Sequence, residues 1–112
     1  MIYERWDVVL VPFPYLDLPL QKKRPAVVLS HWRFNMSHGC TIAAMVTTAN
    51  GGPWPTDVPV GDLAEAGLRH ACYVRWKIFS VPNAAIIRKL GSIAAADRMM
   101  NLEPIVSDIF FG

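Results

Sequence analysis

The stretch that most constrains the fold is RPAVVLS, residues 24–30. A residue that precedes proline is pushed sterically out of the helical region, so Arg24 is expected to begin a strand. Pro25 fits there because the start of a strand can lack a backbone donor. The run that follows is apolar at successive positions, as in strands that are covered on both faces. The sequence therefore predicts a buried strand with a guanidinium at its rim, which either serves a site or simply pairs with a nearby carboxylate.

Further segments have strand composition, because β-branched and aromatic residues dominate them while prolines, glycines or asparagines separate them. They are residues 6–13 (WDVVLVPF), 40–49 (CTIAAMVTTA), a short edge strand after 54–59, 68–79, and 85–90 (AIIRKL). The longest run alternates between a basic face and a core face. The basic face holds Tyr73, Arg75 and Lys77, and the core face holds Val74, Trp76 and Ile78.

Helical signals are confined to two places. Residues 62–66 can form a helical turn that Gly67 ends. In the tail, residues 94–102 and 104–111 have helical spacing, with Pro104 acceptable as the first residue of a second short helix. The expected architecture is mainly β. It is a small barrel of five or six strands with a C-terminal helical segment, forming one domain over residues 1–112.

The composition indicates how the chain is assembled and where it works. Hydrophobic residues make up 53% of the chain and charged residues only 18%, which is rich for one small core, so oligomerisation is expected. No apolar run approaches the roughly 18 residues of a membrane span, since Asp7, Asp17 and two lysines interrupt the first third. Glu4 and Asp7 also stand where a signal peptide would have its apolar core. We therefore expect a cytoplasmic protein without membrane attachment.

The cations are clustered, although the net charge of +2 does not by itself identify a nucleic-acid binder. Each cluster flanks a predicted strand. The clusters are Lys22, Lys23 and Arg24, then Arg75 and Lys77, then Arg88 and Lys89. Two clusters brought together by a barrel would form a phosphate-binding groove, whereas separate clusters would only be solubilising charges at strand ends.

Other features leave alternatives open. Residues 31–39 interleave aromatic side chains with arginine and histidine, which suits base stacking on single-stranded nucleic acid or a subunit interface. Trp54, between two prolines, is either an anchor on the domain or an exposed stacking surface. Cys40 and Cys72 lack metal-ligand spacing and are expected to be reduced, with a disulfide as the alternative. The histidines have no partners at ligand spacing, so no metal site is predicted.

In their order along the chain, the segments DVVLVPFP, KRPAVVLS, IAAMVTT, TDVPV, AGL, YVRWKIFSV and IIRKLGSI resemble the PemK/MazF family of toxins from bacterial toxin–antitoxin modules. The resemblance covers nearly the whole chain. It implies an SH3-like barrel that dimerises and cleaves single-stranded RNA at short sequences, without a metal or other cofactor, unless a cognate antitoxin is bound.

The same resemblance implies which residues form the site. The arginine of the family's RP motif falls on Arg24, and the threonine that ends its AAIT-like strand falls on Thr47. Thr48 stays a competitor, because a one-residue change of register exchanges the two faces of a strand. Contacts to RNA are then expected from Lys22, Lys23, Thr48, Arg75 and Lys77.

The chain departs from the family pattern in three places. Trp6 stands where the family usually has glycine. The loop before Arg24, which could close over a groove, lacks the glycines and the acidic residue that many members carry. Ala94 stands where a serine or threonine usually caps the helix, which predicts a helix start weaker by about 1 kcal/mol.

The implied residues suit RNA cleavage, because RNA carries its own nucleophile in the 2′-hydroxyl. An enzyme must align that group, stabilise the added negative charge and help the 5′-oxygen leave. Arg24 would clamp the phosphate and donate a proton, with the Thr47 hydroxyl beside it. A guanidinium is a poor base since its pKa lies above about 12, so the general base is left open. Two other functions fit the sequence, namely an inactive barrel that binds nucleic acid or a protein, and a structural dimerisation module.

Overall fold

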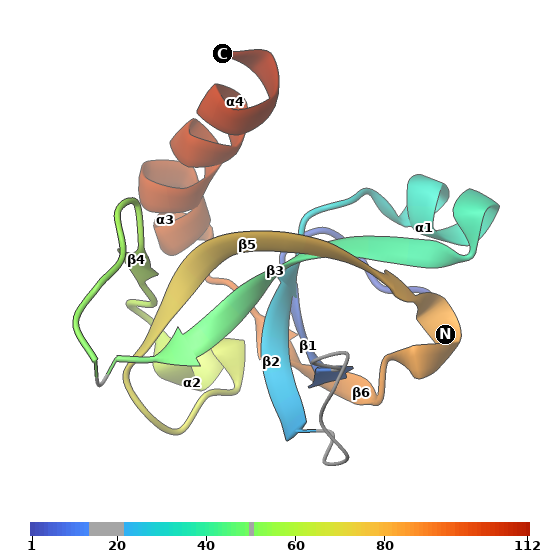
Figure 1. Cartoon of the computed structure of the whole chain (residues 1–112), viewed down its shortest axis with the longest axis horizontal. Coiled ribbons are helices and arrows are strands. Elements are labelled where there is room, and N and C mark those ends of the chain that lie inside the picture. Colours follow the sequence, from blue (N-terminus) through green and yellow to red (C-terminus); the bar gives the residue numbers. More distant parts are fainter. Residues whose placement is uncertain (14–21, 50) are drawn as a thin grey trace.

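The computed structural model describes residues 1–13, 22–49 and 51–112, so most of the expected loop before Arg24 lies outside the described residues. The described chain forms one antiparallel sheet of six strands, in the order β4-β5-β3-β2-β1-β6, that curls into a half-barrel (Figure 1). The strands are β1 (Asp7–Phe13), β2 (Lys22–Val28), β3 (Cys40–Thr48), β4 (Val58–Pro59), β5 (Cys72–Pro82) and β6 (Arg88–Ser92). A C-terminal helix projects away from the sheet (Figure 1). The predicted mainly β fold is confirmed.

Two core clusters cover the two faces of the central strands. The larger cluster consists of Trp6, Val8, Val27, Leu29, Ala44, Val46, Val58, Val60, Ala66, Cys72, Val74, Ile93 and Leu102. The smaller cluster consists of Tyr3, Val9, Val11, Ala26, Val28, Ala43, Val81 and Ile86. Successive residues of a strand point to opposite faces, so a strand residue's cluster tells which face it occupies.

Strand β2 contributes to both clusters, and the prediction of a strand covered on both sides is confirmed. Ala26, Val27 and Val28 each have 0% exposure. The strand begins two residues before the predicted start, because its antiparallel pairing with β1 continues to Lys22. Arg24 is therefore the third residue of β2 and not its first.

Residues 31–39 contain helix α1 (Trp32–His38), which was not predicted from the sequence. The helix begins at His31, whose Nδ1 accepts a 3.1 Å hydrogen bond from the backbone N–H two residues later. It ends at Gly39, whose φ of 69° gives the left-handed conformation common at helix ends. Asn35 is fully buried and ties α1 to the N-terminal segment through its side-chain amide.

Strand β5 does not alternate strictly as predicted. Ala44 of β3 lies opposite Ile78, whereas the next residue, Met45, lies opposite Arg75, so β5 carries two extra residues at this bulge. A bulge re-aims the side chains around it. Ile78 is consequently 37% exposed and Trp76 is only half-buried. The predicted separation into basic and core faces is therefore wrong beyond Arg75.

Helix α2 (Leu63–Ala66) follows the prediction, whereas the short strand β4 (Val58–Pro59) lies inside the segment 54–59 that was expected to precede it. Asp62 caps α2 by accepting a hydrogen bond from the backbone N–H of Glu65 at 3.0 Å. Gly67 ends the helix with a φ of 71°.

Strand β6 begins three residues later than predicted, because the 3₁₀ turn η1 (Asn83–Ala85) precedes it. Gly91, one residue past the predicted end of the strand, lies inside it. A Cβ at Gly91 would come within 2.3 Å of the carbonyl oxygen of Glu65. Glycine is thus required here for β6 to pass close to the backbone of α2.

The C-terminal segment is one continuous helical stretch from residue 95 to 111, and the prediction of two separate short helices is wrong. Its parts are α3 (Ala95–Asp97), the π-helical turn η2 (Arg98–Leu102) and α4 (Glu103–Phe111). Pro104 lies in the first turn of α4, and the wider turn before it suits a residue that has no backbone donor. Ala94 makes no side-chain capping bond. Within the ranges that the structure describes, no helix has both the length and the apolar character needed to cross a membrane.

Candidate active site

The side chain of Arg24 is half-buried, and its Nε is buried without a hydrogen-bond partner among the described residues. Arg24 lies opposite Val11 of β1, on the face of the smaller core cluster. A buried donor without a partner costs about 1–3 kcal/mol, more when the group is charged. Such groups are rare in folded proteins and call for an explanation, of which a functional role is one. The carboxylate partner of a purely structural arginine is absent from residues 1–13, 22–49 and 51–112.

Thr47 lies on the strand next to Arg24 and projects from the same face. Strands β2 and β3 pair as far as Ala26 and Met45, and two residues further along each antiparallel strand stand Arg24 and Thr47. Because side chains alternate, both point to the side of the Ala26–Met45 pair. Thr48 points to the opposite face. The register therefore favours Thr47 over Thr48 as the hydroxyl beside Arg24.

Strand β5 adds Tyr73, opposite Thr47, and Arg75, opposite Met45, to this face. Arg75 is already paired, since its Nη2 lies 2.8 Å from Oδ2 of Asp57, and its Nε donates to the same carboxylate. The side chain of Asp57 is only 1% exposed. Hydrogen bonding between the two groups lowers the pKa of Asp57 and raises that of Arg75. Both groups are thus ionised and largely neutralise each other.

Trp54 packs against both cations of β5. Cζ of Arg75 lies 4.2 Å and Nζ of Lys77 lies 4.4 Å from the centroid of the indole ring. These distances are typical of cation–π contacts. Trp54 is nevertheless 49% exposed, so it is both an anchor on the domain and an open aromatic surface.

The remaining predicted cations lie at the edges of this region. Lys22 and Lys23 are exposed, and alternation places Lys22 on the face of Arg24 and Lys23 on the opposite face. In the third basic cluster, Lys89 forms an ion pair with Asp7 at 3.2 Å. The structure thus brings Lys22, Arg24, Thr47 and Arg75 to one face, and it directs Lys23 and Thr48 away from that face.

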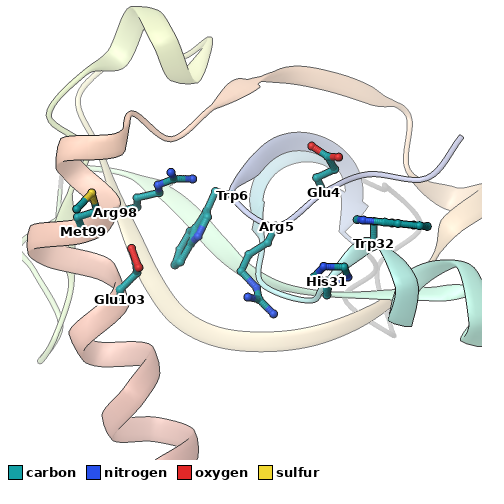
Figure 2. A pocket seen from close by; sticks show the side chains of 8 residues that line it. All are labelled: Glu4, Arg5, Trp6, His31, Trp32, Arg98, Met99 and Glu103. Carbon is teal, nitrogen blue, oxygen red and sulfur yellow. The ribbon is translucent and has the colours of Figure 1, made fainter.

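A separate cavity of about 560 Å³ lies beyond the other end of β2, between the N-terminal segment, α1 and the C-terminal helix. Figure 2 shows Arg5 and Trp6 in its middle, with Arg98, Met99 and Glu103 on one side and His31 and Trp32 on the other. A second cavity of about 340 Å³ shares Arg5, Trp6 and Glu103. Acidic and basic side chains both line the larger cavity, so it does not gather the positive charge that a nucleic-acid backbone requires.

Metal-ligating side chains do not cluster in the described part of the chain, where no three His, Cys, Asp or Glu residues could hold an ion together. Cys40 and Cys72 are free thiols, as expected. Burial raises the pKa of Cys72, which makes it a poor nucleophile at neutral pH.

The family profile described as "PemK-like, MazF-like toxin of type II toxin-antitoxin system" matches residues 4–110. This chain belongs to that family. No curated protein sequence matches the chain significantly.

Solved structures agree with the fold. MazF from Deinococcus radiodurans is 18% identical with a TM-score of 0.75, over 100% of this chain and 99% of that one. An endoribonuclease in complex with its cognate antitoxin, from a mycobacterial species, is 18% identical with a TM-score of 0.74, over 95% and 92%. Mycobacterium tuberculosis toxin MazF-mt6 is 20% identical with a TM-score of 0.68, over 94% and 96%.

The departure of this toxin from the family pattern at Trp6 has a structural counterpart. Trp6 has a φ of 74°, a left-handed conformation that glycine adopts freely and that costs other residues about 1–2 kcal/mol. Its backbone is held in place, because its N–H donates to Val28 O at 2.7 Å and its carbonyl accepts from Ile93 N at 2.9 Å. The indole is 8% exposed within the larger core cluster, and its burial offsets the strain.

Proposed function

We propose that this toxin is a sequence-specific endoribonuclease that cleaves single-stranded messenger RNA without a metal ion or other cofactor. Members of its family are endoribonucleases. The observation that carries the assignment of the site is the Arg24 guanidinium, whose buried Nε has no hydrogen-bond partner among the described residues and whose strand register puts it on the same face as Thr47. A cation with free donors beside a hydroxyl donor matches the charge of a phosphate in its transition state.

The proposed reaction uses a nucleophile that RNA supplies. The 2′-oxygen attacks the neighbouring phosphorus, and the bond from phosphorus to the 5′-oxygen breaks. Arg24 donates hydrogen bonds to the phosphate oxygens and a proton to the departing 5′-oxygen, and Thr47 is a second donor. The products are a 2′,3′-cyclic phosphate and a 5′-hydroxyl. The general base is left unassigned, because a guanidinium is a poor base.

Substrate binding in this proposal is mainly electrostatic. Lys22 and Lys77 contact phosphates, whereas Lys23 and Thr48, which were also expected to contact RNA, project from the opposite face and contribute less. Each phosphate contact to a single strand steepens the salt dependence of binding by about 0.7 on a log–log scale. Arg75 contributes less charge than the sequence suggested, because Asp57 neutralises it.

The proposed partners are a second copy of the chain and a cognate antitoxin, and the proposed location is the cytoplasm, where messenger RNA is found. Large apolar side chains exposed on the C-terminal helical segment support dimerisation, among them Met100 at 76% and Phe111 at 85%. An acidic antitoxin segment suits the same basic face as RNA. Light scattering should give the mass of a dimer at micromolar concentration, and a monomer there would contradict the assembly.

Incubation of the purified toxin with single-stranded RNA in excess chelator tests the activity. We expect cleavage at short sequences, with a 2′,3′-cyclic phosphate on the upstream fragment and a 5′-hydroxyl on the downstream one. Intact RNA that is nevertheless retained in a filter-binding assay would support the alternative function of an inactive RNA-binding barrel. Cleavage that the chelator abolishes would contradict the metal-independent mechanism.

A further inference from the structure

The segment after β3 presents Trp54 as a supported but half-open aromatic surface. The indole rests against Arg75 and Lys77, with 4.2 and 4.4 Å between the ring centroid and the two cationic groups, and 49% of the residue stays exposed. An exposed tryptophan side chain usually contributes little to the stability of a fold. Because side chains of β5 hold the ring of Trp54 in place, its exposed π-surface is available to a ligand.

Several interactions fix the segment that carries this ring. The backbone N–H of Trp54 donates to Asp57 Oδ2 at 2.8 Å, and the N–H of Asp57 donates back to the carbonyl of Trp54 at 3.1 Å. Within the same segment, the carbonyl of Thr56 accepts a hydrogen bond from Nε1 of Trp76 at 2.8 Å. Thr56 itself has a φ of 65°, a strained conformation that persists only where the surroundings enforce it. The ring is therefore positioned before any ligand arrives.

Asp57 also decides what Arg75 can do. Its carboxylate is 1% exposed and binds the guanidinium through both Nη2 and Nε. These donors are thus directed at Asp57 and not at solvent. Arg75 supports the indole instead of acting as a free phosphate contact. Lys77 has no ion pair within the described ranges and keeps its charge available beside the ring.

The supported ring belongs to the face that carries the candidate active site. Arg75 lies opposite Met45, and Tyr73 lies opposite Thr47, so Arg75 and Thr47 project from the same side of the sheet. Two residues along a strand span about 7 Å. Arg75, which supports the ring, therefore projects from the same face as Thr47 and Arg24.

We propose that Trp54 is a stacking platform for a nucleobase of the RNA strand, next to the phosphate that is cleaved, and that Asp57 and Arg75 are positioning residues for this ring. The proposal rests on the proposed function for its substrate. Base–aromatic stacking tolerates any base because every base has a π-face, and it contributes about 1–3 kcal/mol per base. Trp54 thus adds affinity for nucleobases that phosphate contacts alone do not supply.

The experiment compares two polyanions, of which one has bases. The probes are a fluorescent 2′-O-methyl RNA oligonucleotide, which cannot be cleaved, and inorganic polyphosphate as a competitor. Trp54→Ala and Trp54→Leu should weaken binding of the oligonucleotide about 5- to 150-fold, while the affinity for polyphosphate changes less than about twofold. Trp54→Phe should keep most of the affinity of the parent for the oligonucleotide.

Three results would contradict the stacking role of Trp54. In Trp54→Leu, the affinities for the oligonucleotide and for polyphosphate could fall equally, or the affinity for the oligonucleotide could stay unchanged. The third result is a Trp54→Phe variant that binds the oligonucleotide as weakly as Trp54→Leu. Circular dichroism of each variant confirms that the fold is kept. Asp57→Asn should free Arg75 and steepen the salt dependence of oligonucleotide binding by about 0.7. An unchanged slope would contradict the role given to Asp57.

These measurements separate the platform from the proposed function. If the parent protein binds the oligonucleotide through Trp54 but cleaves no RNA, the stacking role of Trp54 stands and the nuclease assignment is contradicted. If the parent protein cleaves RNA and Trp54→Leu cleaves it with the same KM and kcat, the nuclease assignment stands and the stacking role of Trp54 is contradicted.

Discussion

The carboxylate of Asp57 lies 2.8 Å from Nη2 of Arg75, and this ion pair joins the segment after β3 to the middle of β5. The two residues are 18 positions apart in the chain. The pair explains why the cation of Arg75 is turned toward the protein. It also gives the fold a definite dependence on pH.

Unfolding of the parent and of Asp57→Asn at a series of pH values tests this dependence. The pKa of Asp57 is lowered by its hydrogen bonds with Arg75, so the folded state favours the ionised form. The ion pair therefore contributes its full stabilisation above the pKa of an aspartate in the unfolded chain, about 3.9. This stabilisation is lost as the pH falls through the lower pKa that Asp57 has in the folded protein. The parent should be more stable than Asp57→Asn by a constant amount above about pH 5, and this difference should shrink below pH 4. A difference that grows on acidification would contradict the assignment.

Substitutions of Trp6 separate backbone strain from packing. Trp6→Ala should destabilise the fold by about 3–5 kcal/mol, because the buried indole is lost while the left-handed conformation is kept. Trp6→Gly loses the same ring but removes the strain, so it should be about 1 kcal/mol more stable than Trp6→Ala. Urea denaturation measures both variants. An alanine variant as stable as the glycine variant would show that residue 6 is not strained.

Gly91 allows β6 to pass close to α2. An added Cβ would lie 2.3 Å from Glu65 O and 2.5 Å from the carbonyl carbon of Ala66, so the backbones must separate. Gly91→Ala should therefore destabilise the fold by about 1–3 kcal/mol, measured by urea denaturation. Gly51→Ala is the matched control, since nothing lies within 4 Å of a Cβ there. Equal stability of the two variants would contradict the close approach of β6 and α2.

Thr47 and Thr48 are distinguished by the register of β3. Thr47→Val removes the hydroxyl on the Arg24 face, and it should slow RNA cleavage about 10²-fold or more, as expected for the loss of one transition-state donor. Thr48→Val removes a hydroxyl on the opposite face and should slow cleavage much less. Single-turnover cleavage rates with saturating toxin measure the two effects without a contribution from binding. The reverse order of rates would assign the role to Thr48.

Much of the fold was predictable because its signals are local. The apolar run after Pro25, the Asp62 cap and Gly67 each act within a few residues, and the structure has the corresponding elements. Helix α1 was missed because the residue that caps its start, His31, is an unusual capping residue. Gly39, which ends the helix, was the sequence signal that could have indicated it. The bulge in β5 and the continuous C-terminal helix depend on pairing and packing between distant segments, which no short window of sequence records.

The candidate site was predicted from the family resemblance and not from local sequence signals. An arginine at a strand start and a threonine at a strand end are common in any β-protein, so position alone does not single out Arg24 and Thr47. Their shared face became visible only with the register of β2 against β3. The pairing of Asp57 with Arg75 was missed, since nothing in the sequence relates two residues so far apart. Trp54 was noticed in the sequence, but its support by two cations needed the structure.

The most direct test of the nuclease assignment is the cleavage rate of Arg24→Met in chelator, measured beside its free energy of unfolding. Methionine keeps an unbranched stem at this position but removes the buried Nε that has no partner in the described chain. We expect a loss of cleavage of about 10³-fold or more, the effect of removing an arginine that stabilises phosphoryl transfer, together with stability equal to or above that of the parent. A folded Arg24→Met that cleaves RNA at the rate of the parent would contradict the catalytic role of Arg24.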